Sequence, residues 1–177
     1  SIKSIVIFEG TETIEESALE GLSEVEKISI PSTVKAIASN AFTNCKKLER
    51  IEISANNTEY ITDDGVLFNK DKTVLMSCPP SKSGIYKVPD GVIKIGDGAF
   101  YGCTNLSTVK LNKTIDVRNY AFDHCRSLRS ITIPDSVETI GYSAFSLCNI
   151  SSIKIPRSVT SFGGNPFAGS ENLEEID

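Results

Sequence analysis

The sequence predicts an α/β repeat solenoid, in which short parallel strands stack into a sheet and short helical segments pack behind it. The first observation is the pentapeptide Ala-Phe-x-x-Cys, which occurs four times, at residues 41–45, 99–103, 121–125 and 144–148. The second is an apolar-x-apolar triplet that recurs at a spacing of 22 or 23 residues over most of the chain. Self-similarity at a fixed period of roughly 20–50 residues is the signature of repeat architectures.

The apolar triplets are expected to form the strands. They alternate with period two and consist mainly of β-branched residues, which is typical of a short strand with one buried face. A proline follows directly in four of the units and ends the strand, because proline has no N–H to donate to a neighbouring strand. These prolines are Pro31, Pro89, Pro134 and Pro156.

The Ala-Phe-x-x-Cys segments are expected to form short helical or 3₁₀ arcs. Their phenylalanine, cysteine and following leucine are spaced i, i+3 and i+6, which places all three on the inward side of a helix. The run is only about two turns long, so it supports no more than a short arc. Stacked units then bury a common core. The expected core residues are Phe42, Cys45, Phe100, Cys103, Phe122, Cys125, Phe145 and Cys148.

One unit, at about residues 51–85, is irregular. Phe42 and Phe100 are 58 residues apart, which corresponds to one unit of 23 residues and one of 35. The long unit lacks Ala-Phe-x-x-Cys, and its apolar runs Gly65–Phe68 and Thr73–Met76 flank a polar Asn-Lys-Asp-Lys. This pattern predicts a β-hairpin insertion that projects from the convex or lateral side. Whether this hairpin binds a partner is left open.

The cysteines are expected to be packing residues. The first unit has Leu22 at the cysteine position and the last has Ser170, and a site that accepts leucine is a packing site. Free cysteine behaves as a small hydrophobic residue. Neighbouring strands are close enough for disulfides, but stacked parallel side chains usually miss the required torsion, and five is an odd count. With no Cys-x-x-Cys and only one histidine, His124, we expect no metal site and no cofactor.

Charge and motifs exclude several functions. The formal net charge of −5 argues against nucleic-acid binding, which usually requires a basic excess. The chain has no run of 18 apolar residues, so no membrane insertion is expected. It contains no nucleophile elbow, phosphate-binding loop, dinucleotide fingerprint or zinc-protease motif, so we expect it not to be an enzyme.

The candidate ligand-binding residues lie on the outward positions of the predicted strands. The middle residue of each triplet and the residue before it would line the concave face of the sheet, where they hold five basic and two acidic side chains. A basic stripe with hydroxyl groups suits an anionic partner, such as an acidic protein or acidic glycan. The alternative is that these positions hold ordinary soluble strand formers. The candidates are Lys27, Arg50, Glu52, Lys87, Lys110, Ser130, Thr132, Ser152 and Lys154.

Together the units read approximately Leu-x-x-Ile-x-Ile-Pro-x-Ser-Val-x-x-Ile-Gly-x-x-Ala-Phe-x-x-Cys, and residues 128–148 are the fullest copy. The pattern resembles the BspA-like, or treponemal-type, leucine-rich repeat family over essentially the whole chain. Residues 109–122 lack the proline, residues 158–167 replace the alanine, and residues 11–22 lack the cysteine. The resemblance implies a right-handed leucine-rich-repeat solenoid with a concave parallel β-sheet. We expect residues 1–177 to form one such domain, which is a fragment of a longer protein.

The resemblance also implies a function and a location. Such repeats are similar to those of secreted or surface-anchored bacterial proteins, where they look like adhesins. The chain is therefore expected to be a non-catalytic protein- or glycan-binding module at the cell surface. One alternative is a structural spacer, and a second is a thiol enzyme that uses Cys78. The terminal strands leave unpaired edges, so end-to-end self-association is also expected.

Overall fold

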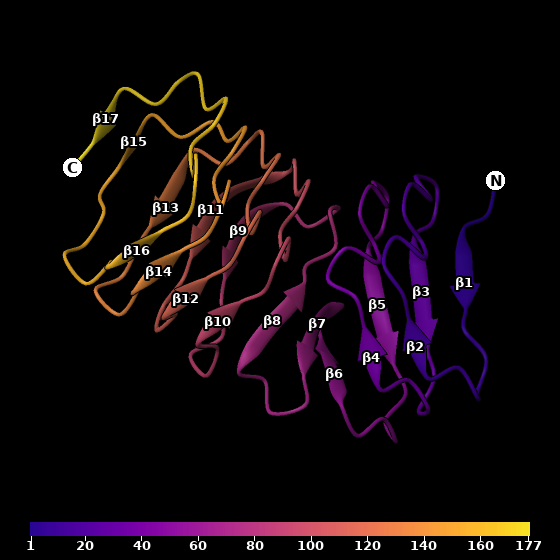
Figure 1. The fold of residues 1–177 in the computed structure, drawn as a ribbon. Helices are drawn as coiled ribbons and strands as arrows, with labels where there is room; N and C mark the ends of the chain where they lie inside the picture. The colour runs from indigo at the N-terminus through magenta and orange to yellow at the C-terminus, as the bar shows by residue number, and fades with distance from the viewer.

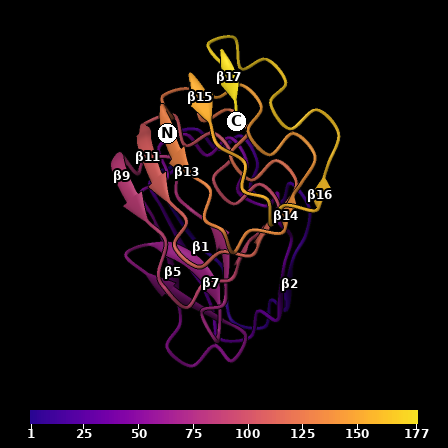
Figure 2. The same cartoon turned by 90° about the vertical axis from the view of Figure 1, so that its left-hand side faces the viewer.

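The computed structural model describes all 177 residues and shows a solenoid of stacked parallel strands. Each regular unit contributes one strand, then a shorter strand, then a series of turns (Figure 1). Strands of equivalent position stack on one another, which gives the coil two sheet faces (Figure 2). We name these the first-strand face and the second-strand face. The Ala-Phe-x-x-Cys segments form the third side, the turn face.

The first-strand face carries the strands that the triplets predicted. In β3 and β5 the inward residues Ile28 and Ile51 lie opposite each other, and both are buried. The face is divided into three parallel sheets rather than one, because β5 does not pair with β9 and β13 does not pair with β15. The sheets are β1 (Ser4–Val6), β3 (Lys27–Ile30) and β5 (Arg50–Ile53); β9 (Gly84–Lys87), β11 (Leu106–Lys110) and β13 (Ser130–Thr132); and β15 (Ser152–Ile153) with β17 (Glu175–Ile176).

The second-strand face consists of two-residue strands, joined at one end by longer antiparallel strands. Each two-residue strand except β16 turns one residue into the core. One sheet pairs β2 (Thr13–Ile14) with β4 (Ala36–Ile37). The other has seven strands in the order β16 (Ser161–Phe162), β14 (Thr139–Ile140), β12 (Asp116–Val117), β10 (Lys94–Ile95), β8 (Val74–Ser77), β7 (Val66–Asn69) and β6 (Tyr60–Asp63).

The predicted helical or 3₁₀ arcs are wrong, because the Ala-Phe-x-x-Cys segments are successive turns and the structure has no helix. In the unit of Phe122, Tyr120 and His124 have φ angles of 56° and 62°. A left-handed residue on either side of the phenylalanine breaks a right-handed helix. The backbone donors then serve neighbouring units: the Phe100 amide donates to the Ala121 carbonyl, with a distance of 2.8 Å between N and O.

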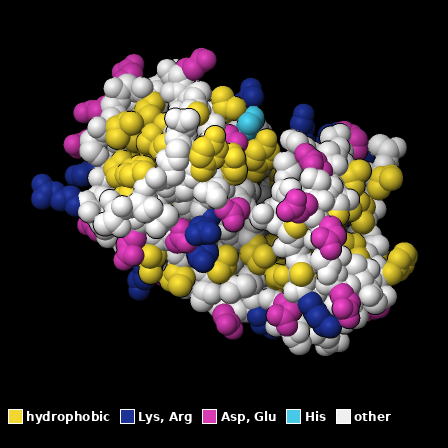
Figure 3. All heavy atoms as spheres, in the orientation of Figure 1, with side chains coloured by type: hydrophobic (Ala, Val, Ile, Leu, Met, Phe, Trp, Pro, Cys, Tyr) yellow, Lys and Arg dark blue, Asp and Glu magenta, His cyan; other side chains and the backbone are white.

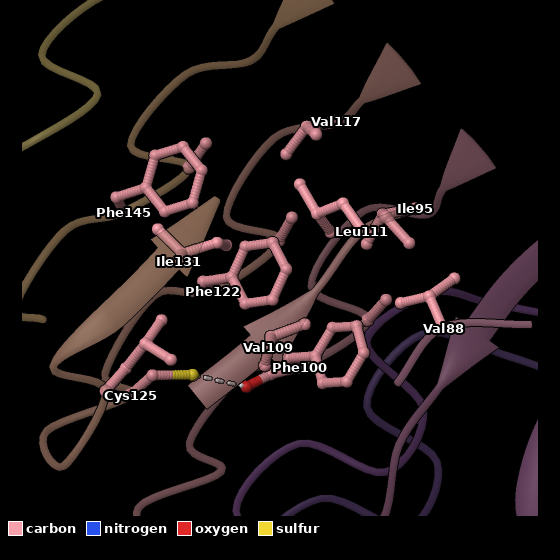
Figure 4. Packing of buried hydrophobic residues seen from close by; sticks show 14 of the residues in the cluster. Val88, Ile95, Phe100, Val109, Leu111, Val117, Phe122, Cys125, Ile131 and Phe145 are labelled. Atoms are coloured by element: carbon pink, nitrogen blue, oxygen red, sulfur yellow. Dashed lines mark hydrogen bonds between the residues drawn. The ribbon is translucent and has the colours of Figure 1, made fainter. Parts of the chain in front are cut away.

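Phenylalanine side chains from the turn face stack in a column within the core (Figure 4). The ring centroids of Phe100 and Phe122 are 4.8 Å apart, and those of Phe122 and Phe145 are 5.3 Å apart, with interplanar angles of 11° and 5°. Tyr86 closes one end of the column with an edge contact to Phe100. All three phenylalanines are fully buried. The column therefore joins successive units through the centre of the solenoid.

The cysteines of the turn face are buried, free thiols that also act as hydrogen-bond donors. The Cys125 thiol donates to the Phe100 carbonyl of the preceding unit, with Sγ 3.0 Å from the oxygen (Figure 4). Cys148 donates to Phe122 in the same way. In the last unit Ser170 replaces cysteine, and its hydroxyl donates to the Phe145 carbonyl at 2.8 Å. In these units the position therefore holds a small side chain that packs in the core and also donates a hydrogen bond.

The irregular unit contains the predicted hairpin, since β7 and β8 pair in antiparallel orientation. The hairpin does not project as expected. Val66 and Phe68 belong to a core of 27 buried residues, whereas Leu67 belongs to a separate core of 13. Because alternate residues of a strand point to opposite faces, β7 is a partition between the two cores. The apolar run of this unit therefore forms an internal wall. The ribbon shows β7 between the strands of the N-terminal units and those of the C-terminal units (Figure 1).

Replacing Phe122 with alanine should destabilise the protein strongly, because the substitution removes a buried ring with stacked neighbours on both sides. We expect a loss of about 3–5 kcal/mol in the free energy of unfolding, measured by denaturant titration. The control Phe162→Ala removes a side chain that is 49% exposed and should cost much less. Equal losses for the two variants would contradict the proposed importance of the column.

Candidate functional site

The predicted site residues lie on the first-strand face but form two separate groups. Lys27, Arg50 and Glu52 lie on β3 and β5, and the others lie on β9, β11, β13 and the β15 segment. The tip of the β6–β7 hairpin lies between the groups, where the Ile51 amide donates to the Gly65 carbonyl at 3.1 Å. A Cβ atom on Gly65 would be 2.7 Å from the Cβ of Arg50, so the tip packs directly against β5. The continuous stripe that the spacing predicted is therefore interrupted.

The first group is half neutralised by its own ion pairs. The Lys27 Nζ lies 2.7 Å from one carboxylate oxygen of Glu52, and the Arg50 Nε lies 3.1 Å from the other. The hydrogen bond from Lys27 is the main cause that lowers the pKa of Glu52. Because two cations share one carboxylate, this group keeps a net charge of only +1 for an anionic partner.

The second group keeps its cations free of ion pairs. Lys87 and Lys110 are directly opposite in register on β9 and β11, and Thr132 follows on β13. Lys154 comes directly after β15. These three lysines are exposed, and none has a carboxylate within 4.0 Å. We name the second group the lysine face; it consists of Lys87, Lys110, Ser130, Thr132, Ser152 and Lys154.

An exposed apolar side chain adjoins the lysine face. Ile85 is 68% exposed and lies opposite Thr108, next to the strand position of Lys87. Like charges directly opposite each other on neighbouring strands are unfavourable, and Lys87 and Lys110 form such a pair. The face thus combines unpaired positive charge, hydroxyl groups and apolar surface.

Cys78 lies inside the protein rather than on a reactive surface. It is 3% exposed, and its carbonyl accepts the Cys103 thiol at a distance of 3.5 Å. In the regular units the carbonyl of a phenylalanine accepts the hydrogen bond from the thiol of the next unit. Cys78 therefore occupies the phenylalanine position of the irregular unit. The structure has no group of three or more His, Cys, Asp or Glu side chains that could hold a metal ion. None of its segments is a helix that could span a bilayer.

The sequence reasoning missed a cleft on the turn face. The irregular unit has no Ala-Phe-x-x-Cys arc, and a hollow separates the arcs on either side of it (Figure 3). The hollow comprises two adjoining cavities of about 350 and 490 Å³ that share Tyr101. We name it the turn-face cleft. The signal that could have revealed it is the missing pentapeptide between Cys45 and Ala99. Its lining includes Ser39, Asn40, Thr43, Asn44, Asp97, Tyr101, Tyr120, Asp123, His124 and Arg126.

The sequence matches the BspA type leucine rich repeat region in six copies, over residues 1–80 and 71–177. The chain belongs to the BspA-type leucine-rich repeat family. The resemblance drawn from the repeat is thereby confirmed. No protein of curated function matches the chain in sequence.

Solved bacterial structures share the fold. The pneumococcal vaccine antigen PcpA is 25% identical over 99% of this chain and 50% of its own, with a TM-score of 0.85. A leucine rich cell surface protein from Faecalibacterium prausnitzii is 27% identical over 99% of this chain and 53% of its own, with a TM-score of 0.79. A leucine-rich repeat protein from Eubacterium ventriosum is 26% identical over 99% of this chain and 41% of its own, with a TM-score of 0.68. The chain thus spans about half the length of these structures.

The thiols should react slowly in the folded protein. Burial raises the pKa of Cys103 and Cys125 well above the usual value and that of Cys148 to about 12. Since the thiolate is the nucleophile, a thiol reagent at pH 8 should label the five cysteines slowly until denaturant is added. A Cys78→Ala variant should label as slowly as the parent. Rapid labelling of one thiol that disappears in Cys78→Ala would revive the thiol-enzyme alternative.

Proposed function

We propose that the protein is a non-catalytic binding module of a secreted or surface-attached bacterial protein, and that its lysine face binds an anionic extracellular macromolecule. The partner carries a row of carboxylate or sulfate groups, and it is either an acidic protein or an acidic glycan. This role corresponds to that of an adhesin.

The observation that carries the proposal is the contrast between the two groups of basic residues. Lys27 and Arg50 share the carboxylate of Glu52, whereas Lys87, Lys110 and Lys154 have no carboxylate within 4.0 Å. Adjacent strands are about 4.8 Å apart, so the lysines present their charges at a spacing set by the sheet. An anionic partner that bridges Lys87 and Lys110 would relieve their mutual repulsion. Net acidity elsewhere on the protein does not cancel this short-range attraction, because salt screens charges beyond about 8–10 Å.

The comparisons support the cellular context. PcpA is a vaccine antigen and the Faecalibacterium protein is described as a cell surface protein, and both match this chain over 99% of its length. A binding face on a rigid stack of units suits a surface protein, because repeat solenoids present extended surfaces to large partners.

The test uses immobilised heparin and poly-glutamate as probes of the two chemistries, at low and high salt. We expect binding that weakens at least tenfold in high salt and at least tenfold in a Lys87→Glu, Lys110→Glu, Lys154→Glu variant, measured by surface plasmon resonance.

The matched control is Lys35→Glu, Lys113→Glu, Arg157→Glu. It changes the net charge equally at exposed positions outside the lysine face. Equal loss in both variants would show that only net charge matters, which contradicts the proposed site. Absence of binding to either probe by the parent protein would favour the spacer alternative.

A further inference from the structure

Backbone hydrogen bonds join each arc of the turn face to the next. The amides of Gly98, Phe100 and Gly102 donate to the carbonyls of the following unit at N–O distances of 2.9, 2.8 and 2.9 Å. The same three positions of the next unit donate again, at 2.8, 2.8 and 3.0 Å. Two or three such bonds join every pair of neighbouring arcs, since Leu19 and Gly21 of the first arc donate in the same way to Ala41 and Thr43.

This pairing fails at the turn-face cleft, where the irregular unit supplies no arc. Asn40, Phe42 and Asn44 hold the three donor positions of the arc on the N-terminal side of the cleft, and their amides have no acceptor within the protein. Backbone N–H groups are obligatory hydrogen-bonding groups, which must find a partner in water or in another chain. One wall of the cleft is therefore an edge of free backbone donors.

The opposite wall is an edge of free backbone acceptors. Asp97 and Tyr101 correspond to Asn119 and Asp123, whose carbonyls accept amides from the preceding unit, but the carbonyls of Asp97 and Tyr101 accept none. Only the middle acceptor is used, since the Cys78 amide donates to the Ala99 carbonyl at 2.7 Å. Cys78 and Pro80 line the base of the cleft between the two edges.

The side chains of the cleft are polar and aromatic, with both signs of charge. The rings of Tyr101 and His124 lie 5.1 Å apart, and the His124 Nδ1 is 2.9 Å from the Asp123 carboxylate. Gly102 borders the larger cavity, and a Cβ atom at this position would meet no atom within 4 Å. The acceptor wall is therefore unobstructed at a position where the next unit carries His124.

We propose that the turn-face cleft binds an extended polypeptide segment of a partner protein, which takes the place of the missing arc. The chain at Cys78 fills only the middle of the gap between the two arcs, and it leaves the amides of Asn40 and Asn44 and the carbonyls of Asp97 and Tyr101 without partners. A polypeptide carries N–H and C=O groups along both edges, as the two walls require, and adding a chain to an open backbone edge is an established mode of peptide recognition. Because the lining carries both signs of charge, the segment bound is uncharged overall.

The probe is a phage-displayed library of random 12-residue peptides, selected on the parent protein and followed by synthesis of the enriched peptides. We expect affinities that are independent of salt and unchanged in the Lys87→Glu, Lys110→Glu, Lys154→Glu variant. This result separates the cleft from the lysine face, so failure of one proposal does not imply failure of the other.

Two substitutions, one on each wall, test the location. Gly102→Asn is tolerated by the backbone, because Asn44 has a φ of 62° at the equivalent position, and it fills the open space. Ser39→Trp places a large side chain on the other wall at an exposed position. Each should weaken peptide binding at least tenfold without changing the melting temperature by more than a few degrees. Enriched peptides that bind both variants as well as the parent would overturn the proposal, as would a selection that enriches none.

Amide hydrogen exchange measured by NMR tests the backbone pairing itself. In the free protein the amides of Asn40, Phe42 and Asn44 should exchange faster than those of Gly98, Phe100 and Gly102. A bound peptide should slow the first three at least tenfold. Equal protection of the two sets in the free protein would overturn the proposal. A peptide that binds without protecting Asn40, Phe42 and Asn44, or a glycan that binds in competition with the peptide, would also overturn it.

Discussion

Hydrogen bonding between units, rather than within them, is the constraint on which this structure depends. The turn-face amides reach the carbonyls of the next coil, and the cysteine thiols reach those of the preceding coil. A unit taken alone would leave these groups to water and its apolar side chains exposed. Neighbouring coils thus supply both the polar partners and the buried surface, and the phenylalanine column follows from the same stacking.

The sequence predicted the features that depend on pattern alone. Period-two triplets located the first strands, and the change of period located the hairpin of β7 and β8. The helical prediction failed because a spacing of i and i+3 also fits successive turns that send Phe122 and Cys125 inward. What decides between them is the left-handed backbone at Tyr120, His124 and Leu147, and tyrosine and leucine give no such signal in a sequence.

The candidate site was predictable in register but not in electrostatics. The spacing aligned Lys87 with Lys110, as the strand pairing shows. It could not reveal that Glu52 binds both Lys27 and Arg50, because that depends on side-chain positions across two strands. Nor could it reveal that the hairpin tip at Gly65 separates the two groups, since a short apolar run fits a projecting hairpin and an internal wall equally well.

The partition formed by β7 has a consequence for how such a chain changes in length. In a repeat array the folding free energy is approximately the sum of the intrinsic stabilities of the units and the interface energies between neighbouring units. A change in one unit therefore affects mainly the units beside it. Here Val66 and Phe68 pack on one core and Leu67 on the other, and neither core continues through the wall. Units can be gained or lost on one side while the packing of the other side stays intact. The irregular unit thus connects two separately packed cores and contributes side chains to both.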